Sequence, residues 1–529
     1  MNHSNSTMPL SRQLRYEKEC RQKWKENAAK KQEKIRQYVE KTRTLKKSRD
    51  RWRTKAQKSQ QQVRFLEQKV YHLELELFHL KQQLASSTTT SSSEDTTPPS
   101  DPDDLDEHSP SPFHHRYSLS TISISVKQVI LAGHSYQGAS TSISIFSSPS
   151  SPHSTTIKSW VERLGLYELQ RPKEKRDDWI FIADLTLELG QEKAFVIYGI
   201  PYQYWSTHVL SQRRALTYTD GQILALEVTT EATGEWIESI LHSLSFQIGT
   251  PLQIISDHGS NLKKGIQLFQ SYHPRLYYTY DVTHAMANLL EKQLFSDDLF
   301  PQFLSDCHHC LLQVQQTEFA FASPPPQRSQ CRFFNLDPLL HWARTMLSIP
   351  LTLLFQLLPH YPTEHISRRF FEKFSWLFPY QKHIQLWSTL LHMTRSIETI
   401  VKTQGLNSSS LFLFHKSLSS LDIPPCLFPF KHQLFNYFYT QLSSHPPYPL
   451  LATSDILESL FGRYKYFSKR CPLKELRSLL LTIPLSTVNL TPQFIKDALM
   501  TVSNADLSQW VNHTFGQSML SKRKSLFSF

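Results

Sequence analysis

The stretch QIISDHGSNLKKGI, residues 253–266, constrains the fold more than any other part of the chain. It begins with a short, mainly apolar run of the length typical of a buried strand. Residues 256–259 break this run, and a helical pattern starts at Asn261. A strand that ends in an acid and is followed by a turn and a helix places the carboxylate at the carboxyl end of a sheet. In open α/β folds ligands bind at that edge, so we predict that Asp257 belongs to a functional site.

The segments on either side of this stretch predict a mixed sheet. The first three strand-like runs are separated by turns, and the later ones alternate with helical patterns. The expected strands are 179–189, 194–200, 223–228, 253–257 and 275–281, and the expected helices are 233–244, 260–271 and 283–294. Three antiparallel strands followed by crossover strands give a mixed five-stranded sheet with helices on both faces. We therefore assign residues 173–298 to an α/β unit.

The N-terminal 85 residues predict a basic helix that ends in a coiled coil. Apolar residues from Val63 to Leu84 recur at alternating spacings of three and four, which is a heptad pattern and favours a homodimer or a larger oligomer. Residues 1–85 hold 22 Lys and Arg against nine Asp and Glu, whereas the remainder holds 36 against 37. A basic arm on a near-neutral body indicates a polyanionic partner, with nucleic acid favoured. An isolated charged helix is the alternative.

Four further regions are expected to be linker or helix. Residues 86–112, rich in Ser, Thr, Pro and Asp, predict a disordered linker. Residues 113–172 carry three helical patterns compatible with a helix-turn-helix unit, whose last helix would enter the DNA major groove and present Lys158 and Arg163. A plain helical bundle remains an alternative. Residues 299–450 predict an all-α insertion, and residues 476–529 a helical tail.

Three acids stand out within this organisation. Asp184 interrupts the apolar strand sequence IADLTL, and a buried carboxylate needs a hydrogen bond, a partner or a metal. The first and fourth strands of the expected sheet are neighbours, which would bring Asp184 close to Asp257. Two close carboxylates repel each other unless a divalent cation neutralises them. Glu458, on a helix expected over 454–470 within the segment 451–475, is the best candidate for a third acid.

Four segments resemble a known family: DDWIFIADLTLELGQEK, IISDHGSNLKKGI, YDVTHAMANLLEKQL and SDILESLFGRYK. They are similar to insertion-sequence DDE transposases, which have an RNase H-like (retroviral integrase-like) catalytic core. The particular resemblance is to a bacterial group with a basic coiled-coil N-terminus and a helical insertion before the last acid. It covers about residues 117–475, and the family's catalytic triad falls on Asp184, Asp257 and Glu458.

The resemblance implies metal-dependent DNA strand cleavage and strand transfer at transposon ends. Two Mg²⁺ (or Mn²⁺) ions, roughly 3.5–4 Å apart, would be held by the three carboxylates. It also implies DNA contacts, supporting acids and bases, and self-association through the coiled coil. The expected DNA contacts are Lys263, Lys264, Arg463 and Lys465, and the expected supporting residues are Asp281 and His284.

Other features limit the alternatives. Residues 1–18 lack the apolar core of a signal peptide, and no apolar run is long enough for a membrane span, so we expect a soluble, intracellular protein of a bacterial cytoplasm or a eukaryotic nucleus. The resemblance to a bacterial group implies the cytoplasm, with association to the nucleoid. The chain has no Gly-rich phosphate loop and no Gly-x-Ser-x-Gly elbow, which argues against a nucleotide hydrolase and a serine hydrolase. A catalytically inactive, domesticated DNA-binding protein and a purely structural coiled-coil protein remain as alternatives.

Overall fold

The computed structural model describes residues 115–146, 151–187, 192–326, 335–468 and 477–527, together with Gln32. The chain divides into two units, Met1–Asp104 and Leu105–Phe529, and all that follows concerns the second. The predicted coiled coil and linker lie outside the described residues, apart from Gln32. Within the described ranges, no helix has both the length and the apolar character that a membrane crossing requires.

A five-stranded mixed sheet lies at the centre of this unit, with the strand order β3-β2-β1-β4-β5. Its strands are β1 (Trp179–Leu187), β2 (Lys193–Pro201), β3 (Gln222–Thr229), β4 (Gln253–Ser256) and β5 (Tyr277–Tyr280). β1, β2 and β3 are antiparallel, whereas β4 is parallel to both β1 and β5. The predicted mixed sheet is confirmed, and its topology is consistent with an RNase H-like core.

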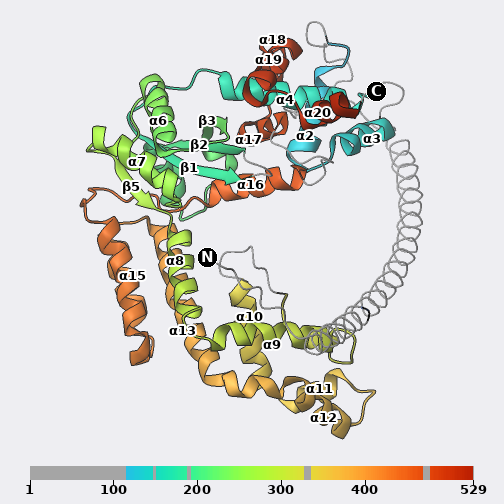
Figure 1. Ribbon diagram of the computed structural model, residues 1–529, viewed down its shortest axis with the longest axis vertical. Helices are drawn as coiled ribbons and strands as arrows, with labels where there is room; N and C mark the ends of the chain where they lie inside the picture. The colour runs from blue at the N-terminus through green and yellow to red at the C-terminus, as the bar shows by residue number, and fades with distance from the viewer. Residues whose placement is uncertain are drawn as a thin grey trace, which may run out of the picture. The chain divides into compact units, whose positions relative to one another are not determined.

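Helices cover both faces of the sheet, because the side chains of β1 alternate between two cores (Figure 1). Phe181 and Ala183 pack on one face, against α6 (Gly234–Ile248) and α7 (Ser260–Tyr272). Ile180 and Ile182 pack on the other face, against α16 (Asp455–Ser468). The three helices lie within one or a few residues of the ranges that the sequence predicts.

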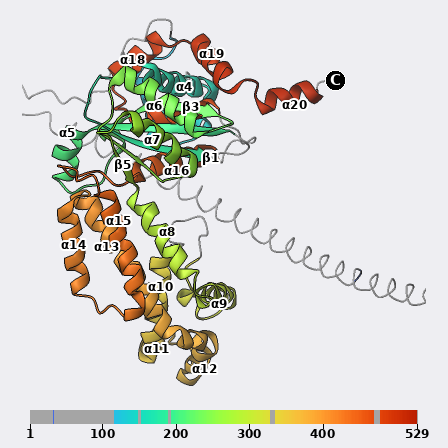
Figure 2. The same ribbon diagram turned by 60° about the vertical axis from the view of Figure 1, so that its left-hand side comes forward.

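Between β5 and α16 the chain forms a helical region with its own extended core. Its helices are α8 (Val282–Leu294), α9 (Leu299–Val314), α10 (Leu336–Ser348), α11 (Leu351–Leu357), α12 (Thr363–Phe374), α13 (Gln381–Gln404), α14 (Ser408–Ser419) and α15 (Phe428–Gln441). The long helix α13 packs against α8, α14 and α15 (Figure 2). The described part of the insertion is helical, as the sequence predicts.

Helices before β1 pack with helices after α16, except α20, in two small shared cores, although residues 113–172 and 476–529 are predicted as two regions. The helices are α2 (Leu119–Ile130), α3 (Tyr136–Phe146), α4 (Ser154–Gln170), α17 (Thr482–Leu485), α18 (Pro492–Thr501), α19 (Asn504–Phe515) and α20 (Met519–Phe527). α4 contacts α2 and α3 as well as α17, α18 and α19. The two predicted regions therefore bury apolar residues against each other.

Candidate active site

Asp184 and Asp257 reach the same edge of the sheet on neighbouring parallel strands. In the register of β1 and β4, Ile182 lies opposite Ile255. Asp184 comes two residues after Ile182, and Asp257 comes two residues after Ile255. The two acids therefore stand at the same level along the strands. Both side chains are half-buried. The predicted adjacency of the first and fourth strands is confirmed.

The strand alternation directs Asp184 toward the face that α16 covers, whereas Asp257 follows the last residue of β4. Ile182 and Ile255 belong to the core shared with α16, and residues two apart in a strand point to the same side. α16 buries Leu457 and Leu460 in this core, and Glu458 lies beside them, half-buried. The helix with the third predicted acid therefore covers the face toward which Asp184 points.

The carboxylates of Asp184 and Asp257 each accept a hydrogen bond from a backbone N–H one or two residues away. The backbone N–H of Leu185 donates to Asp184 Oδ1 at 2.7 Å, and the N–H of Gly259 donates to Asp257 Oδ1 at 2.9 Å. Among the residues that the structure describes, no three His, Cys, Asp or Glu side chains gather closely enough to hold a metal ion. The fold thus aligns the strand ends and the helix, while the side chains do not converge into a ligand set.

Asp281 connects the end of the sheet to two helices. It is fully buried and caps α8, accepting a hydrogen bond from the N–H of His284 at 2.7 Å. Its second oxygen accepts from the N–H and the hydroxyl of Ser454, at 2.5 and 2.9 Å, just before α16 begins. Burial by itself raises the pKa of Asp281, but the hydrogen bonds from His284 and Ser454 outweigh it and lower the pKa to about 2.

His284 lies between Asp281 and the third acid. Its Nδ1 is 3.3 Å from Asp281 Oδ1 and 4.0 Å from Glu458 Oε1. The imidazole thus lies between the carboxylates of Asp281 and Glu458, where it could orient Glu458. The functional role of Asp281 and His284 as supporting residues stays a prediction.

The segment leading into α16 is fixed to the sheet by Gln253, which the sequence reasoning did not single out. Gln253 is fully buried in β4, and its Nε2 donates to the Leu451 carbonyl at 2.5 Å and to Thr279 Oγ1 at 2.8 Å. Its Oε1 accepts from the N–H of Leu451 at 3.2 Å. The amide thus acts as an additional strand partner for residue 451. A polar residue in an otherwise apolar strand was the available signal.

His258 also escaped prediction, although it is next to Asp257. Its φ of 60° lies in the left-handed region, which is uncommon for a residue other than glycine. The ring stacks on Tyr280 with centroids 4.0 Å apart and planes 6° from parallel. Burial, followed by the charge of Lys263, lowers the pKa of His258 to about 4. The stack holds the loop that presents Asp257, and no periodic pattern in the sequence indicates it.

The basic residues expected to contact DNA occupy different environments. Lys263 and Lys264 are exposed in the second turn of α7, and Lys264 is paired with Glu235 at 2.5 Å. On α16, Lys465 is exposed, whereas the guanidinium of Arg463 lies 5.7 Å from the ring centre of Tyr218. Burial lowers the pKa of Arg463. Their contact with DNA stays a prediction.

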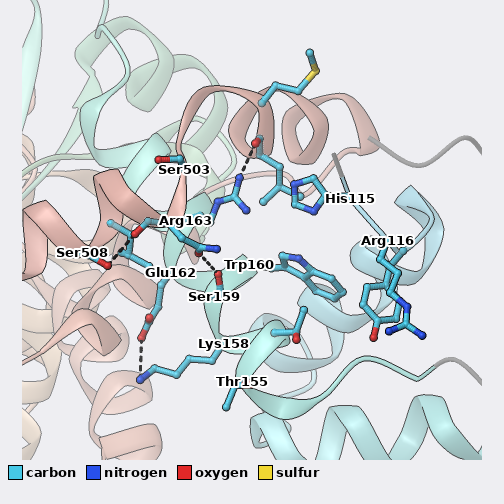
Figure 3. Close-up of a pocket in the computed structure, with 16 residues that line it drawn as sticks. His115, Arg116, Thr155, Lys158, Ser159, Trp160, Glu162, Arg163, Ser503 and Ser508 are labelled. Carbon is cyan, nitrogen blue, oxygen red and sulfur yellow. Dashed lines mark hydrogen bonds and ion pairs between the residues drawn. The ribbon is translucent and has the colours of Figure 1, made fainter. Parts of the chain in front are cut away.

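Arg163 is buried, which corrects the expectation that the last helix of residues 113–172 presents it at the surface. Its side chain, labelled in Figure 3, is buried, and its guanidinium donates to the carbonyls of Val502 and Leu499 at 2.6 Å each. α4 is also too enclosed to enter a major groove along its length: a Cβ added at Gly165 would lie 2.1 Å from the Leu481 carbonyl oxygen. Lys158, in contrast, is 51% exposed and lines a cavity of about 960 Å³ between α4 and α19.

Comparison with known proteins gives structural neighbours only. No protein-family model and no curated protein matches the chain. The chain is similar to the Drosophila P element transposase strand transfer complex, with 13% identity over 74% of this chain and 93% of that chain and a TM-score of 0.31. It is also similar to the simian T-cell lymphotropic virus intasome in complex with the PP2A regulatory subunit B56 gamma, with 12% identity, 43% and 69% coverage and a TM-score of 0.14. At these TM-scores neither likeness bears on what the chain does.

Proposed function

We propose that the chain is a metal-dependent enzyme of the DDE transposase type that cleaves DNA and transfers strands at transposon ends. One observation supports the proposal: Asp184 in β1 and Asp257, directly after β4, stand level on neighbouring parallel strands, and the helix that carries Glu458 covers one face of these strands. The carboxyl end of parallel strands is where α/β folds bind ligands.

The donor set fits Mg²⁺ or Mn²⁺, because these ions prefer carboxylate oxygens. We assign Asp184, Asp257 and Glu458 as the ligands of two such ions. When bound, the ions would supply charge neutralisation and activation of the attacking hydroxyl. The protein's part is to hold the three carboxylates in place, with Asp281 fixing the start of α16 and His284 orienting Glu458.

DNA is the proposed partner. Lys158, Lys263, Lys264 and Lys465 are exposed and could contact phosphates, Lys158 and Lys264 by exchanging their ion pairs with Glu162 and Glu235, and the basic residues 1–85 would add sequence-independent affinity. We further propose a dimer or larger oligomer through the coiled coil, and a bacterial, nucleoid-associated location. These proposals rest on the sequence pattern and on the resemblance to bacterial insertion-sequence enzymes.

The decisive test is Asp257→Asn in the full-length protein. Supercoiled plasmid and duplexes made from inverted repeats flanking the gene are incubated with protein and Mg²⁺, and nicked and joined products are measured. The variant should lose these products while retaining DNA affinity, because Asn removes a ligand charge and leaves the shape unchanged. Asp298→Asn, an exposed acid before α9, is the matched control and should behave as wild type. Undiminished cleavage by Asp257→Asn would remove this residue from the site.

A catalytically silent DNA-binding protein is the second candidate. The observation that favours it is that no three potential ligands converge among the described residues. Such a protein would bind DNA with a steep salt dependence. It would produce no Mg²⁺- or Mn²⁺-dependent nicks, and the wild-type reaction in the same assay separates the two candidates.

A further inference from the structure

Side chains of the helical region between β5 and α16 contact Asp455, in the first turn of α16. Lys402, near the C-terminal end of α13, places its Nζ 2.6 Å from Asp455 Oδ2. The other oxygen of Asp455 accepts a hydrogen bond from the hydroxyl of Thr283, on α8, at 3.3 Å. Asp455 is thus held from two sides by helices that follow the sheet in sequence.

The helix that carries Lys402, α13, is itself held by further ion pairs. One turn earlier on α13, Glu398 is buried and accepts a hydrogen bond from Arg395 Nη1 at 2.7 Å. The same arginine pairs with Asp337 of α10, its Nε lying 3.2 Å from Oδ2. Ion pairs thus link α13 to α10 through Arg395 and, further along the same helix, to α16 through Lys402.

Asp455 and Glu458 lie three residues apart in the first turn of α16, so a shift of the first is passed to the second. The carbonyl of Ser454 accepts from the N–H of Leu457 at 2.9 Å, which defines this first turn. The side chains of Lys402 and Asp455 are 30% and 45% exposed, at the wall of a cavity of about 440 Å³. An ion pair this accessible adds little to folding stability. The main effect of the Lys402–Asp455 ion pair is therefore to fix the position of the first turn of α16.

We propose that Lys402 is a positioning residue, which fixes the first turn of α16 through Asp455 and thereby sets where Glu458 stands. The helical insertion would then determine the geometry of the third acid rather than only fill the space between core segments. The catalytic consequence rests on the proposed function, whereas the clamp on α16 is independent of it.

The test compares full-length Lys402→Met, which keeps the aliphatic stem, with Lys402→Arg, which keeps the charge. Lys382→Met, an exposed lysine at the other end of α13, is the matched control. Amide hydrogen exchange over residues 455–461 should accelerate about two- to fivefold in Lys402→Met, the range that loss of a partly exposed ion pair produces. Lys402→Arg and Lys382→Met should exchange like wild type, and the thermal midpoint of all three should be unchanged.

A second readout is the Mg²⁺ dependence of plasmid nicking. The Mg²⁺ concentration that gives half-maximal nicking should rise in Lys402→Met, while the half-saturating plasmid concentration stays constant. Unchanged exchange over 455–461 in Lys402→Met, or equal acceleration in Lys382→Met, would overturn the inference. A wild-type protein that nicks no DNA would overturn the proposed function, and the exchange data would still decide whether Lys402 holds α16.

Discussion

Replacing Asp281 by Asn should destabilise the protein substantially, because this buried carboxylate joins three elements. It follows β5, caps α8 through His284 and binds Ser454 ahead of α16. Its pKa is about 2 in the folded protein against an ordinary value of 3.8. At roughly 1.4 kcal/mol for each pKa unit, the folded state favours the ionised form by about 2 kcal/mol. Asn offers one acceptor oxygen in place of two and turns an N–H₂ toward donors. We therefore expect a loss of about 2–3 kcal/mol at pH 7.

The pH dependence gives this prediction a definite sign. Because the folded pKa lies below the unfolded one, the carboxylate contributes its full stabilisation above about pH 4 and loses it as pH falls toward 2. The difference in unfolding free energy between wild type and Asp281→Asn should therefore shrink across that interval. Urea unfolding of the full-length protein, followed by tryptophan fluorescence, measures both quantities. A loss below about 0.5 kcal/mol at pH 7, or a difference that stays constant from pH 5 to pH 2, would refute the reasoning.

Two further substitutions probe the packing around the site. Gln253→Leu should cost about 2–4 kcal/mol in the same unfolding assay, because it leaves the backbone groups of Leu451 without their amide partner; Gln267→Leu, on the exposed side of α7, is its control and should change little. Arg163→Met should lower stability by about 1–3 kcal/mol, since two buried carbonyls lose their donors, yet leave plasmid affinity unchanged once the folded fraction is accounted for. A drop in plasmid affinity with unchanged stability would restore Arg163 as a DNA contact.

The sequence by itself determined the strands and helices of the core and the common level of Asp184 and Asp257 along neighbouring strands. Alternating and apolar runs predicted the five strands, and the helical spacing predicted α6, α7, α8 and α16 closely, because local periodicity reflects which face of each element is buried. Two parallel neighbouring strands, each ending near an acid, follow from that order, and so does the common position of Asp184 and Asp257. The mixed sheet was therefore predictable before any contact was known.

Only the tertiary structure decided which elements share a core and which polar groups hold them. Arg163 bonds to residues 336 and 339 positions away, and Gln253 to a residue 198 positions away. No local spacing records such distances, so α4 resembled a surface helix although its second face is buried against the tail. The position of Glu458 belongs to this class as well: it depends on how the insertion returns its chain to the sheet, through Gln253, Asp281 and Lys402. Which polar side chains bridge distant segments depends on how all the elements pack together. In the sequence these residues appear only as isolated polar positions.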